Sequence, residues 1–64
     1  NYTLSLAASG DGRASVEVDG VEALGIDDVG STARTAKVNL TKGAHAIRVV
    51  TVGDVRVEAV DVRR

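Results

Sequence analysis

The chain has 64 residues, with no cysteine, no proline and a single histidine. A chain this short has room for one domain with a thin core, because it buries only about 60% of the surface that its unfolded form exposes. Eight basic and nine acidic residues are interleaved and leave a net charge of −1, so no field of one sign favours nucleic acid or an anionic membrane as a partner.

The N-terminal half predicts short strands separated by glycine-bearing turns. Apolar and polar residues alternate over residues 2–8 and again over residues 14–18, which is typical of strands with one buried face. Residues 9–13 contain two glycines and an aspartate, so we expect the chain to reverse there. Asp19-Gly20 is a strong hairpin signal and predicts a tight turn into a third strand over residues 21–26.

The C-terminal half predicts three more strands after an irregular loop over residues 25–32. Alternation continues through residues 33–41, 44–52 and 55–62, with turns at Thr41-Lys42-Gly43 and Gly53-Asp54. Within the last of these strands, Val55 and Val57 lie at odd positions, whereas Val60 and Val62 lie at even positions. A β-bulge near Glu58-Ala59 would bring both pairs of valines onto one face. The alternative is a strand that is buried on both sides.

Together these patterns predict an all-β fold without a helix: a small antiparallel β-sandwich or jelly-roll-like domain of about six short strands. It would form a single domain over residues 1–64, or the C-terminal half of a larger sandwich. The alternation also predicts the core. Its expected members are Leu4, Leu6, Val16, Val18, Val38, Leu40, Ile47, Val49, Val60 and Val62.

Four segments carry a family resemblance: Tyr2-Thr3-Leu4, the Val-Glu-Val-Asp-Gly of residues 16–20, the Val-Asn-Leu-Thr-Lys-Gly-Ala-His-Ala-Ile-Arg-Val of residues 38–49, and the Val-Glu-Ala-Val-Asp-Val of residues 57–62. The chain resembles the C-terminal half of the galactose-binding-like β-sandwich carbohydrate-binding modules of bacterial glycoside hydrolases. Complete modules of that family are roughly twice as long. The resemblance implies a secreted, non-catalytic accessory module beside an enzyme domain.

The resemblance also implies where a polysaccharide or oligosaccharide would bind, and the candidate residues are Tyr2, Asp27, Asp28 and Asp54. Sugars stack on aromatic rings in such modules, but Tyr2 is the only aromatic residue. It alternates in phase with the leucines that follow it, which favours a core or rim tyrosine over a sugar platform. We therefore expect weak or lost sugar binding.

Other chemistry finds little support in the sequence. No calcium-loop spacing and no nucleophile motif occur, and His45 at a strand end favours a structural role. We expect no enzyme activity, no metal and no cofactor. The alternative function is a purely structural or self-associating β domain. Ala46, Val50 and Val52 on the outward face predict a partner, either an adjacent domain or a second copy.

Overall fold

The computed structural model describes all residues, Asn1–Arg64, and contains one antiparallel sheet of four strands and no helix. The strands are β1 (Tyr2–Val18), β2 (Val21–Ile26), β3 (Gly30–Val38) and β4 (Ile47–Arg63). β1 lies in the middle: it pairs with β4 along one side, and with β3 and then β2 along the other. The all-β prediction is confirmed, whereas the expected six strands are four.

The number of strands is lower because two glycine-bearing segments bend a strand instead of ending it. β1 and β4 stay paired through the bend, where Gly12 lies opposite Gly53. Gly12 has φ 142° and Gly53 has φ 92°; a Cβ atom on Gly12 would overlap the carbonyl oxygen of Val52, and one on Gly53 would lie 2.7 Å from the carbonyl oxygen of Asp11. Only glycine fits this geometry. The turns expected at residues 9–13 and 53–54 are therefore one shared bend.

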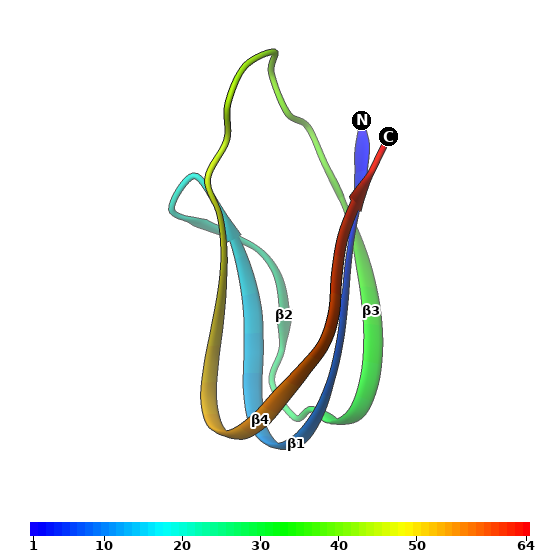
Figure 1. Cartoon of the computed structure of the whole chain (residues 1–64), viewed down its shortest axis with the longest axis vertical. Coiled ribbons are helices and arrows are strands. Elements are labelled where there is room, and N and C mark those ends of the chain that lie inside the picture. Colours follow the sequence, from blue (N-terminus) through cyan, green and yellow to red (C-terminus); the bar gives the residue numbers. More distant parts are fainter.

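The bend folds the sheet over on itself, and Figure 1 shows β1 and β4 each descending on one side and rising on the other. We call the two halves of the folded sheet the β3 layer, in which residues 2–10 of β1 pair with β3, and the β2 layer, in which residues 14–18 of β1 pair with β2. The core lies between the layers. Its buried members are Leu4, Leu6, Ala8, Ala14, Val16, Leu24, Ile26 and Val29.

The core prediction is partly wrong. Leu4, Leu6 and Val16 are buried as expected, and the two layers partly cover Val18, Val38, Val49 and Val62. Ile47 and Val60 are instead 39% and 38% exposed, because both lie on β4, which has no neighbouring strand on its outer side. Leu40 lies beyond the end of β3 and is half-buried. Alternation identifies the inward face of a strand but not how much of that face is covered.

Two local predictions are confirmed. The Asp19-Gly20 turn joins β1 to β2, with φ 52° at Asp19 and 85° at Gly20. In the pairing of β1 with β4, Ala7 lies opposite Ala59 and Ala8 lies opposite Val57, so Glu58 is the extra residue of a bulge. As a result Val55 and Val62, at odd and even positions, both pack against the core.

The connection between β2 and β3 is shorter than expected. Residues 25–32 were predicted as a loop, but β2 ends at Ile26 and β3 begins at Gly30. Val29 is buried and its N–H donates to the carbonyl oxygen of Gly12 at 3.0 Å, which fixes this turn against the bend. At the other end β3 stops at Val38, so residues 39–46 form a loop where parts of two strands were predicted.

Candidate functional site

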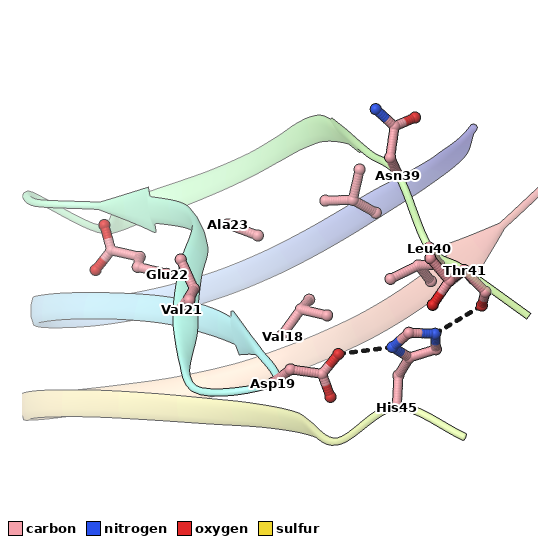
Figure 2. A pocket seen from close by; sticks show the side chains of 10 residues that line it. Val18, Asp19, Val21, Glu22, Ala23, Asn39, Leu40, Thr41 and His45 are labelled. Atoms are coloured by element: carbon pink, nitrogen blue, oxygen red, sulfur yellow. Dashed lines mark hydrogen bonds and ion pairs between the residues drawn. The ribbon is translucent and has the colours of Figure 1, made fainter. Parts of the chain in front are cut away.

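The largest pocket of the molecule, which we call the open-end pocket, lies at the open end of the folded sheet, opposite the bend. It has a volume of about 450 Å³ and lies beside the β1–β2 turn, the start of β2, the end of β3 and the loop of residues 39–46 (Figure 2). Its apolar lining consists of Val18, Val21, Ala23, Val38 and Leu40, and its polar lining of Asp19, Glu22, Asn39, Thr41 and His45.

The apolar lining extends the core to the surface. Val18, Ala23 and Val38 are half-buried and pack against the buried cluster between the layers. Val21 is 70% exposed at the first position of β2. The core is therefore incompletely covered at this end, where its apolar side chains line the pocket.

His45 joins the loop of residues 39–46 to the β1–β2 turn. Its Nδ1 lies 2.6 Å from Oδ2 of Asp19, and its Nε2 lies 2.7 Å from the carbonyl oxygen of Thr41 (Figure 2). A carboxylate and a carbonyl can only accept hydrogen bonds, so both ring nitrogens must carry a proton. This geometry holds His45 as the imidazolium cation.

Asp19 uses its other carboxylate oxygen and its backbone for the same attachment. Oδ1 accepts the N–H of Ala46 at 2.9 Å, and the N–H of Asp19 donates to the carbonyl oxygen of Ala46 at 2.8 Å. We call these contacts of Asp19, Thr41, His45 and Ala46 the latch. They tie together two segments that are more than 20 residues apart in the sequence.

The latch changes the protonation equilibria of both side chains. The hydrogen bond to Asp19 raises the pKa of His45 above its ordinary value of 6.5, and the Thr41 carbonyl raises it further. The hydrogen bond from His45, followed by that from the Ala46 N–H, lowers the pKa of Asp19 below 3.8. Both pKa shifts have the same cause, because the hydrogen bonds of the latch stabilise the charged form of each side chain.

A histidine beside an aspartate invites comparison with an acid–base pair, but the geometry assigns this pair to structure. A general base needs a free ring nitrogen directed at a substrate. Here both nitrogens and both carboxylate oxygens of the pair are hydrogen-bonded within the latch. The structural role expected for His45 agrees with these contacts, although its partner Asp19 was predicted only as a turn residue.

The structure separates the four residues predicted to bind sugar. Tyr2 is half-buried at the start of β1 near the open end, and it lies opposite Val38. Asp54 lies opposite Asp11 at the bend, and nine residues of β1 at about 3.3 Å each place Tyr2 roughly 30 Å from that pair. Tyr2 and Asp54 therefore belong to opposite ends of the molecule.

The other two candidates lie in the turn between β2 and β3, beside the bend. Asp27 and Asp28 are exposed, and Oδ1 of Asp27 accepts a hydrogen bond from the Nε–H of Arg13 at 2.9 Å. The same guanidinium donates to Oε1 of Glu22 at 2.7 Å, so Arg13 bridges the two ends of β2. Asp27 thus has a partner within the chain, and none of the three aspartates lines the open-end pocket.

No group of three or more histidine, cysteine or acidic side chains is arranged to hold a metal ion. The structure contains no helix that could span a membrane. Searches of family models, curated proteins and solved structures find no match to this chain.

Proposed function

We propose that the chain is a non-catalytic binding module that takes the apolar face of a small polar ligand into its open-end pocket. The observation that carries the proposal is the composition of this pocket, in which apolar side chains continuous with the core meet a polar rim. Binding sites typically combine an apolar lining with a few polar groups that fix orientation. The latch forms one wall and has no free acid–base group to offer.

The ligand class we propose is a saccharide, as in the carbohydrate-binding modules that the sequence resembles. A sugar ring presents C–H groups on its faces and hydroxyl groups at its edge, which suits an apolar floor beside Asn39 and Thr41. No aromatic side chain lines the pocket, and each hydrogen bond gained against water contributes only about 1 kcal/mol. Three or four such bonds correspond to a dissociation constant of about 1–10 mM.

The proposal extends to the architecture and setting of the domain. The two layers of the folded sheet would act as the two layers of a small β-sandwich, with the ligand at the end where they separate. A module of this kind would serve a secreted glycoside hydrolase by holding an attached enzyme domain near its polysaccharide. Support for this setting comes from the sequence resemblance alone.

The test is a titration of ¹⁵N-labelled protein with xylo-, cello- and galacto-oligosaccharides, followed by amide chemical shifts. We expect millimolar, saturable shifts at Ala23, Asn39 and Leu40. Ala23→Leu, which fills the pocket, should abolish them. The matched control Ala33→Leu adds the same volume at an exposed position of β3 outside the pocket and should leave them unchanged.

Three outcomes separate the alternatives. Shifts that respond to Ala23→Leu but not to Ala33→Leu support the pocket. Saturable shifts at Asp27, Asp28 and Asp54 would move sugar binding to the bend and overturn the pocket. No shift at any residue would overturn sugar binding and favour the alternative of a structural β domain without a ligand.

A further inference from the structure

The second half of β4 offers an unpaired sheet edge that is distinct from the open-end pocket. β4 pairs with β1 on one side, and no strand covers its other side. Only two backbone hydrogen bonds lie outside the sheet pairing. Their donors are Asp19 and Val29, so neither bond uses the free edge of residues 54–63. Exposed edges are templates for pairing with a further strand.

The sequence of this edge is complementary to itself when it is read in the opposite direction. Residues 54–63 are Asp-Val-Arg-Val-Glu-Ala-Val-Asp-Val-Arg. An antiparallel copy centred between Glu58 and Ala59 places Asp54 opposite Arg63 of the partner subunit and Arg56 opposite Asp61 of the partner subunit. Every valine then faces a valine. No other antiparallel register joins all four of these charges to opposite charges.

The bulge at Glu58 makes this register compatible with a closed two-fold dimer. Opposed residues in an antiparallel pair lie on the same face of the sheet, whereas residues an odd number apart in a regular strand lie on opposite faces. Arg56 and Asp61 are five apart. The extra residue Glu58 reverses the alternation between them, so the two charges share one face, just as Val55 and Val62 share the other against the core.

The same register covers the apolar side chains that β4 leaves exposed. Val57 and Val60 are 37% and 38% exposed, and in this arrangement they meet the partner's Val60 and Val57. Cross-strand valine pairs and opposite charges are both favourable in antiparallel sheets. The free edge, the charge order, the bulge and the exposed valines thus all point to one occupant.

We propose that residues 54–63 of β4 pair with the same residues of a second copy, forming a two-fold dimer whose β3 layers join in one continuous sheet. The interface is isologous, as in most homodimers. The dimer goes beyond the binding function proposed above, because none of residues 54–63 lines the open-end pocket.

The carboxylate of Glu58 opposes dimer formation, and its substitution therefore tests the proposed register. Glu58 lies next to the two-fold axis, so two carboxylates approach one another there. Each carboxylate accepts the Ser9 hydroxyl of its own chain at 2.9 Å, which holds it over its own sheet. We expect Glu58→Gln to strengthen the dimer, because it removes the repulsion and keeps an acceptor for Ser9.

The central experiment is sedimentation equilibrium over a concentration range that reaches millimolar, with a charge-exchange cycle. Arg56→Asp places two carboxylates opposite one another and should weaken association at least tenfold, as should Asp61→Arg. The double variant Arg56→Asp/Asp61→Arg restores opposite charges and should recover the dimer. Arg34→Asp on β3 makes the same change in net charge on the opposite edge and should have no effect.

The register is tested by disulfide formation, since the chain has no cysteine of its own. Mixed samples of Val57→Cys and Val60→Cys should form a crosslinked dimer, whereas each variant alone should not. Circular dichroism establishes that each variant is folded. A chain that stays monomeric at millimolar concentration overturns the proposal, as does a double variant that fails to recover association, or crosslinking of either cysteine variant with itself.

Discussion

At its closed end the sheet bends on glycines, whereas at its open end two side chains tie a loop to a turn. At the bend, backbone atoms approach so closely that Gly12 and Gly53 leave no room for a side chain. At the latch, a charged histidine and a carboxylate supply the contacts. The bend therefore depends mainly on close backbone packing, whereas the contacts of the latch depend on the protonation of His45 and Asp19.

The largest effect is expected from a methyl group at the bend. Gly12→Ala would place Cβ against the carbonyl oxygen of Val52, a backbone atom that can move only if β1 and β4 separate. We expect this variant not to fold, because the core of so small a domain supplies only about 3–5 kcal/mol. Far-UV circular dichroism and thermal denaturation would show the loss.

Gly43→Ala is the matched control for this change. Gly43 also has a positive φ, of 123°, but nothing lies within 4 Å of the position its Cβ would occupy. It should cost only the backbone strain of about 1–3 kcal/mol. Equal effects of the two substitutions would mean that the bend does not depend on close backbone approach.

The next effect concerns the core between the two ends. Leu6 is 1% exposed in the β3 layer, and Leu6→Ala should destabilise the domain by about 2–5 kcal/mol through the cavity it leaves. Ile47 is 39% exposed, so Ile47→Ala should cost less than about 1.5 kcal/mol. Urea denaturation of both variants would decide the order, and a larger loss at Ile47 would show that β4 is covered in solution.

The sequence predicts those features of the fold that depend on neighbouring residues. Asp19-Gly20 specifies its hairpin locally, and the change of parity between Val57 and Val60 predicts either a bulge or a strand buried on both sides, of which the structure has the bulge. Neighbouring residues do not predict the bend. A positive-φ glycine can end a strand or bend it, and the outcome here depends on Gly53, which lies about 40 residues after Gly12.

The open-end site was harder to predict for the same physical reason. Asp19 and His45 are 26 residues apart and come together only because the loop of residues 39–46 crosses the end of the folded sheet. The resemblance to carbohydrate-binding modules implies one sugar site formed by Tyr2, Asp27, Asp28 and Asp54, which the structure separates. No spacing in the sequence shows at which end of a folded sheet a residue lies.

The smallest and most specific effect is the pH dependence of the latch. His45 has a raised pKa, so its contribution to stability is complete below pH 6.5 and is lost as the pH rises through the higher value of the folded state. Asp19 has a lowered pKa, so its contribution is present above pH 3.8 and is lost as the pH falls through the lower folded value. The latch should therefore be complete between about pH 4 and pH 6.5.

We expect the melting temperature to fall, and the amides of Asp19 and Ala46 to lose protection from hydrogen exchange, as the pH rises above that window. The amide of Val29, which donates to Gly12 at the bend, should keep its protection and serves as the internal reference. His45→Gln removes the titrating group, so its melting temperature should be lower than that of the parent chain near pH 5.5, and the difference should shrink as the pH rises above the raised pKa of His45. Since His45 is the only histidine, a pH-dependent loss of protection at Ala46 that persisted in His45→Gln would show that the open end is held by something other than the imidazolium.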